Sequence, residues 1–199
     1  MTAMNPTTFC RFVWGVYHLF LGTWFGAMVM LIIAAAITFK TVAAYRPTLG
    51  AEPYARLTEI DAGAKYPIGV RVLAGGIVGN VLKGLRGISL VCAAAVAVCL
   101  VLQWTLWPVR GWANLVRTVL IAAATAVVLI DMAVISPRVW RERAVMYDPD
   151  QSAADRAAAQ SRFERMHKLN ERIVGVAALS LGAALVLSAW AWPGTPGED

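Results

Sequence analysis

Asp131 is the residue of this sequence whose type and position most directly indicate chemistry. It follows the apolar run 118–130 and precedes Pro137 by six residues. An ionisable side chain within a membrane-spanning helix is a candidate functional group, because a charge in the bilayer is costly unless it is paired or used. Asp131 either forms a structural pair, with Arg86 and Arg172 as the candidate partners, or acts as a polar group on a permeation pathway.

The histidines and cysteines are too scattered to hold a metal ion together. His18 lies in the first long apolar stretch, His167 lies in a basic connection, and Cys10 precedes both. Cys92 and Cys99 share a helix face, but at about 1.5 Å per residue they are about 10 Å apart along the axis. A zinc ion binds sulfur at about 2.3 Å. We therefore expect no metal site, no cofactor and no disulfide framework.

Two pairs of glycines have the spacing of helix-packing motifs. Gly22 and Gly26 form a G-x-x-x-G motif in the first apolar stretch, and Gly75 and Gly79 repeat it before the second. Small residues at this spacing let helix backbones approach closely in a membrane, where lipid removes the hydrophobic drive for association. We expect these glycines to be packing positions within the protein, with a dimer face as the alternative.

Sequence motifs of the common catalytic sites are missing. The chain has no G-x-S-x-G, no Walker loop, no H-E-x-x-H and no dinucleotide-binding fingerprint. We therefore expect no catalytic residue, no cofactor-binding residue and no enzymatic activity of a classical kind.

The composition places these residues in a membrane protein. Hydrophobic residues make up 59% of the 199 residues and charged residues only 15%, whereas a soluble domain has about 25% charged residues. Too little polar surface remains to cover a water-facing core. This balance excludes a disordered chain, a disulfide scaffold and most soluble enzymes.

Four stretches are long and apolar enough to cross a bilayer, which needs about 20 residues in helix. The first, second and fourth carry no Asp, Glu, Lys or Arg, and the third carries Arg117 and Asp131 near its ends, where long side chains can reach the interface. The predicted fold is all-α, an integral membrane four-helix bundle forming a single transmembrane domain. The predicted spans are about 13–39, 87–109, 112–136 and 173–192.

Two of the helices are expected to extend beyond the membrane. The segment 66–82 is apolar but is interrupted by Arg71, so it is either a re-entrant helix or an extension of the second helix. We favour the extension, because Ile68 to Trp107 contains no proline. Ser152 has N-cap chemistry for a helix that begins near Ala153 and runs into the fourth span.

The positive charges indicate the orientation of the chain. Every Lys and Arg except Arg11, Arg110 and Arg117 lies in the amphipathic connections 40–86 and 137–172, and basic connections stay on the cytoplasmic side. Both termini should then lie outside. Tryptophans favour membrane interfaces, and most of them gather at the ends assigned to the outer face: Trp14, Trp104, Trp107, Trp112, Trp190 and Trp192.

Several short segments resemble the family of transmembrane protein 205 and its bacterial counterparts, the domain of unknown function 4149. The resemblance begins at 18–26 (HLFLGTWFG) and continues at 74–79 (AGGIVG), 136–141 (SPRVWR) and 163–170 (FERMHKLN). The sequence departs from the family at 83–86 (KGLR), where an aromatic residue is expected, and in its long first connection. The resemblance implies four spans and no defined reaction.

The sequence leads to one principal hypothesis and two alternatives. We expect a membrane protein of structural or interaction type in the cell membrane, by preference a bacterial inner membrane. Its expected partners are membrane lipids and a second copy or other membrane proteins, without nucleic acid. The alternatives are a membrane enzyme and a small transporter or permeation subunit using Asp131, with His18, Asn80 and Gln103 as the other polar groups near membrane depth.

Overall fold

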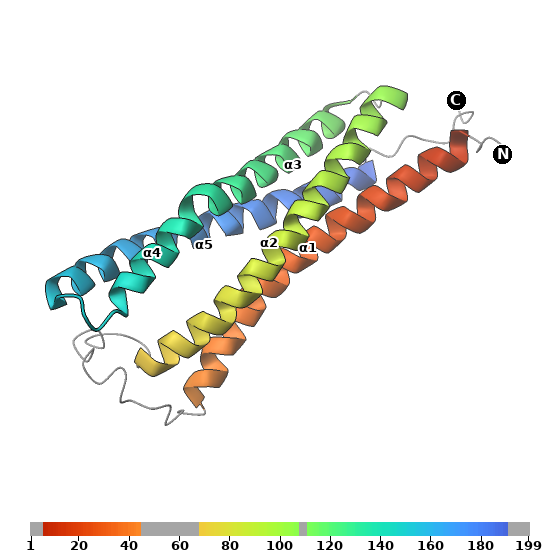
Figure 1. The fold of residues 1–199 in the computed structure, drawn as a ribbon. Coiled ribbons are helices and arrows are strands. Elements are labelled where there is room, and N and C mark those ends of the chain that lie inside the picture. The colour runs from red at the N-terminus through yellow and green to blue at the C-terminus, as the bar shows by residue number, and fades with distance from the viewer. Residues whose placement is uncertain (1–5, 45–67, 108–110, 191–199) are drawn as a thin grey trace, which may run out of the picture. The chain divides into compact units, whose positions relative to one another are not determined.

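The computed structural model describes residues 6–44, 68–107 and 111–190. These residues form helices and no strands (Figure 1). The all-α character expected from the sequence is confirmed, and four of the helices are long and apolar enough to cross a membrane. The elements are α1 (Pro6–Ala44), α2 (Ile68–Leu106), α3 (Trp112–Ile130), the π-helical turn η2 (Asp131–Ile135), α4 (Ser136–Met146) and α5 (Ala153–Trp190).

Both helix extensions are continuous with the apolar helices that follow them. α2 runs unbroken from Ile68, because this stretch lacks a proline that would remove a hydrogen bond of the helix. α5 begins directly after Ser152, whose Oγ accepts the backbone N–H of Asp155 at 3.1 Å. The N-cap at Ser152 is therefore confirmed. The rest of the first connection, residues 45–67, lies outside the described residues.

The third helix extends beyond the predicted span 112–136 and past Pro137. It continues through η2 into α4 and ends at Met146. Within η2 the backbone N–H of Ser136 donates to the carbonyl oxygen of Asp131, five residues earlier. A proline has no N–H to donate and its ring crowds the preceding turn. A π-helical turn inserts one residue and accommodates Pro137 without ending the helix.

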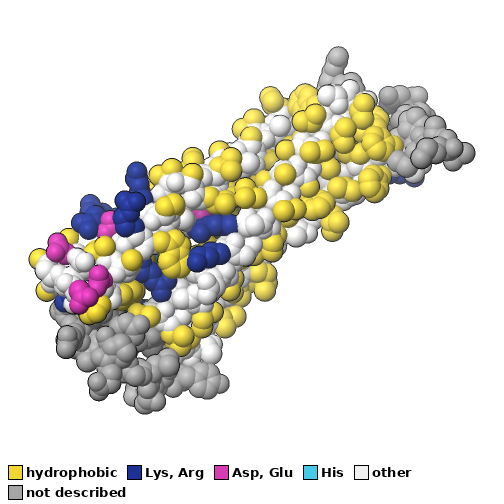
Figure 2. Space-filling view, viewed as in Figure 1, with side chains coloured by type: hydrophobic (Ala, Val, Ile, Leu, Met, Phe, Trp, Pro, Cys, Tyr) yellow, Lys and Arg dark blue, Asp and Glu magenta, His cyan; other side chains and the backbone are white. Residues whose placement is uncertain are grey.

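The described residues divide into two compact units, to which every long helix contributes. Unit 1 consists of the described residues within 1–29, 86–128 and 174–199, and unit 2 of the described residues within 30–85 and 129–173. In unit 1 the side chains on the outside are apolar, as Leu179 (76% exposed) and Val91 (62% exposed) show. In Figure 2, hydrophobic side chains (yellow) cover the visible surface of α2 and α3 in unit 1. An apolar exterior is what a surface facing lipid requires.

The interior of unit 1 combines large aromatic side chains with polar ones. Trp14, Tyr17 and Trp24 of α1 are completely buried. Gly182 of α5 lies beside Phe25, whose ring would be 3.1 Å from a Cβ at that position. Trp14 is therefore a core residue rather than the interfacial residue we expected. Trp112 and Trp190 are 65% and 74% exposed, as interfacial residues require.

Unit 2 is held together by side chains of α4 that lie against α2. Arg143 donates from Nη1 to the carbonyl oxygen of Gly75 at 2.9 Å and from Nη2 to that of Val72 at 3.0 Å. The Trp140 ring lies so close to Gly79 that a Cβ there would be 2.5 Å from Cη2. Gly75 and Gly79 are thus close-contact positions in unit 2, and their neighbours are side chains rather than a helix backbone.

Gly22 and Gly26 are surrounded by open space in the described part of the chain. A Cβ at either position would meet no atom within 4 Å in the described part of the chain. Among the described residues there is thus no close contact at these two glycines, and their packing role, within the protein or at a dimer face, stays a prediction. The G-x-x-x-G spacing is common in apolar helices and does not determine which face of the helix meets a neighbour.

Candidate functional site

Arg117 lies at the centre of a polar cluster inside unit 1. Its side chain is completely buried, although Arg117 belongs to the apolar helix α3. We expected this arginine to extend to the membrane interface. Instead it points inward, because α3 is flanked on this side by polar groups that bind the guanidinium group.

Two neutral oxygens accept hydrogen bonds from the Arg117 side chain. Nη2 donates to Oε1 of Gln103 on α2 at 2.8 Å and to Oδ1 of Asn114 one turn earlier on α3. The rings of Trp14 and Tyr17 lie against the guanidinium group, each with its centroid 4.9 Å from Cζ. A desolvated arginine over an aromatic face gains roughly 2 kcal/mol from each such contact. Arg117 is therefore stabilised by amides and aromatic rings.

The cluster reaches α5 through Tyr17. The hydroxyl oxygens of Tyr17 and Ser188 are 2.9 Å apart, and Ser188 Oγ also lies 2.6 Å from the carbonyl oxygen of Ala184. A serine hydroxyl has one proton, which Ser188 donates to Ala184, so Tyr17 donates to Ser188. The chain of contacts from Ser188 through Tyr17 and Arg117 to Gln103 joins α5, α1, α3 and α2. We call these residues, with Trp14 and Asn114, the Arg117 cluster.

His18 lies at the edge of the Arg117 cluster. Its Nδ1 is 2.9 Å from the carbonyl oxygen of Trp14, and its ring stacks on Trp14 with centroids 5.6 Å apart. The Tyr17 ring meets the His18 ring edge-on. Of the residues singled out from the sequence, the structure thus brings His18 and Gln103 to one cluster, around an arginine that sequence reasoning did not select.

The Arg117 cluster consists of a cation held by neutral acceptors and aromatic rings, and it also contains unused hydrogen-bond donors. Arg117 Nε and Nη1 and Gln103 Nε2 are buried and have no hydrogen-bond acceptor among the described residues. In this part of the chain no group of three His, Cys, Asp or Glu side chains could hold a metal ion. The arrangement holds helices together and offers spare donors. It does not pair a nucleophile with a base.

Asp131 belongs to unit 2 and is buried within the π-helical turn η2. Its Oδ1 accepts a hydrogen bond from Ser136 Oγ at 3.0 Å. A π-helical turn in an α-helix is frequently found at a functional position. Asp131 therefore combines three unusual features: a charge-bearing group, burial in a helix of spanning length, and a local change of helix geometry.

His167 has a surface environment in unit 2. Its ring is stacked on Phe163, with centroids 5.6 Å apart, and Nε2 lies 3.2 Å from Glu171 Oε1 one turn later. Both members of this pair are more than half exposed. Asn80 is exposed as well. Neither residue contributes to a buried polar site.

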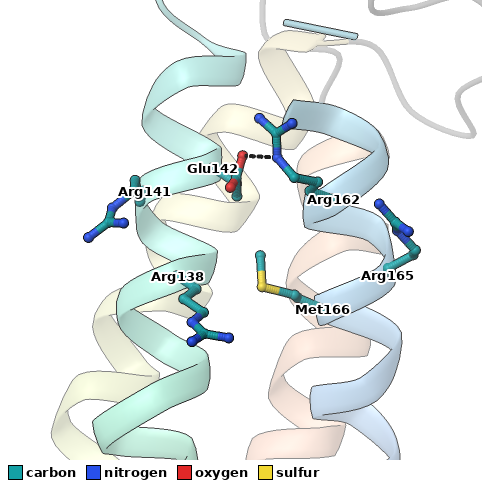
Figure 3. Close-up of a pocket in the computed structure, with 6 residues that line it drawn as sticks. All are labelled: Arg138, Arg141, Glu142, Arg162, Arg165 and Met166. Carbon is teal, nitrogen blue, oxygen red and sulfur yellow. Dashed lines mark hydrogen bonds and ion pairs between the residues drawn. The ribbon is translucent and has the colours of Figure 1, made fainter. Parts of the chain in front are cut away.

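A pocket lies between α4 and α5 in unit 2 and has a volume of about 350 Å³ (Figure 3). Glu142 and Arg162 point toward each other across it and form an ion pair at 2.9 Å. Met166 and Arg138 point between the two helices, whereas Arg141 points away from α5. The pocket is lined by Arg138, Arg141, Glu142, Arg162, Arg165 and Met166.

The turn before α5 has one perturbed carboxyl group. The backbone N–H of Asp150 donates to Asp148 Oδ1 at 3.0 Å, which lowers the pKa of Asp148 below its ordinary value. A hydrogen bond from the Gln151 amide and the positive charge of Arg156 lower this pKa further. This carboxylate orders the turn that leads to the Ser152 cap.

The sequence contained a signal for the Arg117 cluster, although a weak one. Asn114 and Arg117 are three residues apart, and Trp14 and Tyr17 are also three apart, so each pair shares a helix face. That these faces meet depends on how the helices are rotated against each other, which local spacing does not specify.

No family model, curated protein or solved structure matches this chain.

Proposed function

We propose that this chain is a non-enzymatic integral membrane protein, a four-helix bundle acting as a structural or interaction component. In this proposal α2 and α5 extend into the cytoplasm of a bacterial cell, the connections 40–86 and 137–172 lie inside, and both termini lie outside. The concentration of Lys and Arg in these connections, with only Arg11, Arg110 and Arg117 outside them, supports the orientation. The resemblance to the transmembrane protein 205 family is part of the same proposal.

The observation that carries the proposal is the Arg117 cluster. Its side chains contact one another and link those parts of α1, α2, α3 and α5 that belong to unit 1. In a membrane, interhelical hydrogen bonds and close packing replace the hydrophobic effect as the source of helix association. Polar residues used in this way stabilise a scaffold whose apolar exterior is available to lipid and to other membrane proteins.

Reconstitution of the purified protein into vesicles tests this function. For a structural or interaction component, proton and anion fluxes equal those of protein-free vesicles. Purification in mild detergent then retains a stoichiometric partner, either a second copy or another membrane protein. A flux that depends on Asp131, together with a protein that purifies as a lone monomer, contradicts the proposal.

The second candidate function is a small transporter or permeation subunit. The π-helical turn at Asp131 favours it, because this geometry places a buried carboxyl group within a helix of spanning length. In this case wild-type vesicles pass protons or solute, Asp131→Asn removes the flux, and the surface variant Glu171→Gln leaves it unchanged.

A further inference from the structure

We propose that the pocket between α4 and α5 is a binding site for a phosphate group. The phosphate group is carried either by an anionic phospholipid headgroup or by a free solute. This inference goes beyond the scaffold role proposed above, and only its lipid form depends on the proposed orientation. Its basis is the composition of the pocket lining, which contains four arginines and a single carboxylate, the latter already paired with Arg162.

The ion pair in the pocket leaves a positive surplus. Arg162 is bound to Glu142 through Nε at 2.9 Å. In the described part of the chain, Arg138, Arg141 and Arg165 form no hydrogen bond or ion pair. Guanidinium groups held around one pocket repel each other, and an anion between them relieves this repulsion. The pocket is therefore more favourable when an anion is bound.

Arginine is the side chain best suited to a phosphate group. Its planar guanidinium donates two parallel hydrogen bonds to neighbouring phosphate oxygens, whereas lysine acts as a point charge. In Figure 3, Arg138 on α4 and Arg165 on α5 come from opposite sides of Met166. At about 350 Å³ the pocket is near the lower end of the volumes typical of ligand sites, about 300–1,000 Å³. It accommodates a headgroup or a small phosphorylated solute.

The position along α5 places the pocket near the headgroup layer in the proposed orientation. Arg172 is the last charged residue before the apolar run 173–192. At about 1.5 Å per residue, Arg165 and Arg162 lie about 10 and 15 Å beyond it along the helix. The headgroup layer extends about 5–8 Å beyond the hydrocarbon on each side, and arginine side chains reach back toward it. Both sources of phosphate are therefore within reach.

The test compares the full-length protein with two pocket variants and one control, each in nanodiscs of zwitterionic phosphatidylcholine. One arm adds phosphatidylglycerol and measures the lipid retained by native mass spectrometry. The other arm titrates inorganic pyrophosphate by calorimetry. Arg138→Gln/Arg165→Gln removes two charges from the pocket, and Lys168→Gln/Arg172→Gln removes two charges from α5 outside it. All four side chains are exposed, so the two double variants are matched.

The two pocket variants are expected to change affinity in opposite directions. Arg138→Gln/Arg165→Gln weakens binding about tenfold or more, because hydrogen bonds to charged groups are lost. Glu142→Gln strengthens it roughly two- to fivefold, because Arg162 is released and the opposing carboxylate is gone. A gain in affinity cannot result from misfolding. The control changes affinity less than about threefold, since its charges make no hydrogen bond to a ligand in the pocket and attract it only through screening solvent.

Each outcome supports or overturns the proposal. Pocket-dependent retention of phosphatidylglycerol identifies a lipid headgroup as the source, and pocket-dependent binding of pyrophosphate identifies a solute. The proposal is overturned when neither ligand binds, when the control loses as much affinity as the pocket variant, or when Glu142→Gln weakens binding.

Discussion

Replacing Arg117 and Gln103 by leucine, singly and together, isolates the hydrogen bond that joins α3 to α2. The change in unfolding free energy of either single variant does not isolate this bond. Arg117→Leu loses two hydrogen bonds and two aromatic contacts, but it also removes a buried charge whose desolvation costs several kcal/mol. Gln103→Leu leaves the guanidinium group with one acceptor fewer. The interaction energy of the double-mutant cycle cancels these separate terms.

The expected coupling follows from the geometry of the bond. Arg117 Nη2 and Gln103 Oε1 are 2.8 Å apart and buried. A hydrogen bond to a charged group contributes about 1.5–3 kcal/mol in soluble proteins, whereas interhelical bonds in membranes average about 0.6 and reach about 1.7 kcal/mol. We therefore expect a coupling of about 1–2 kcal/mol, near the upper end of the membrane range.

The assay is the free energy of unfolding in mixed micelles, measured as the fraction of detergent that denatures is raised. The matched control pairs Arg117→Leu with Thr125→Val on the same helix. Thr125 donates to the carbonyl oxygen of Ile121 at 2.8 Å and lies about 12 Å from Arg117 along the axis. Its expected coupling is within about 0.5 kcal/mol of zero. A Gln103 coupling as small as that of the control refutes the cluster as a link between helices.

Three further predictions concern unit 2. Gly79→Ala places a Cβ 2.5 Å from the Trp140 ring and is expected to destabilise the protein by about 1–3 kcal/mol. Gly76→Ala, with open space around it, is neutral or stabilising by up to about 1 kcal/mol in the same assay. Ser152→Ala removes the N-cap of α5 and should cost about 1 kcal/mol, visible as faster amide exchange in its first turn. Because the folded-state pKa of Asp148 is lowered, its carboxylate stabilises the turn above the unfolded-state pKa, and this contribution disappears as the pH falls through the folded-state value. Amide exchange of the turn should therefore rise at acidic pH in the wild type and show no such step in Asp148→Asn.

The sequence predicts the helical elements well because length and apolarity determine which segments can cross a membrane. The N-cap of α5 was also predictable, since the chemistry of Ser152 is local. The predicted span 112–136 ends just before Pro137, but the helix continues beyond it, because a proline ends a helix only where the backbone cannot adjust. Here a π-helical turn at 131–135 accommodates it. The helix propensities of individual residues do not indicate where a π-helical turn forms.

The candidate sites were less predictable than the helices. The position of Arg117 near one end of the predicted third span is typical of a charge at the membrane interface. Only the rotation of α3 relative to its neighbours makes Arg117 a core residue. The same dependence explains Gly22, whose motif indicated close packing but whose surroundings are open. Helix rotation is determined by contacts between residues far apart in the chain, here Tyr17 with Ser188, and these contacts leave no local pattern.

The most direct test of the central claim is the sidedness of the connections. Alkaline phosphatase, active only outside the inner membrane, and a green fluorescent protein, fluorescent only inside, are each fused after Asp199 and within 150–160. Four crossings with cytoplasmic basic connections predict phosphatase activity at Asp199 and fluorescence at 150–160. The reverse pattern, or the same reporter active at both positions, contradicts the claim.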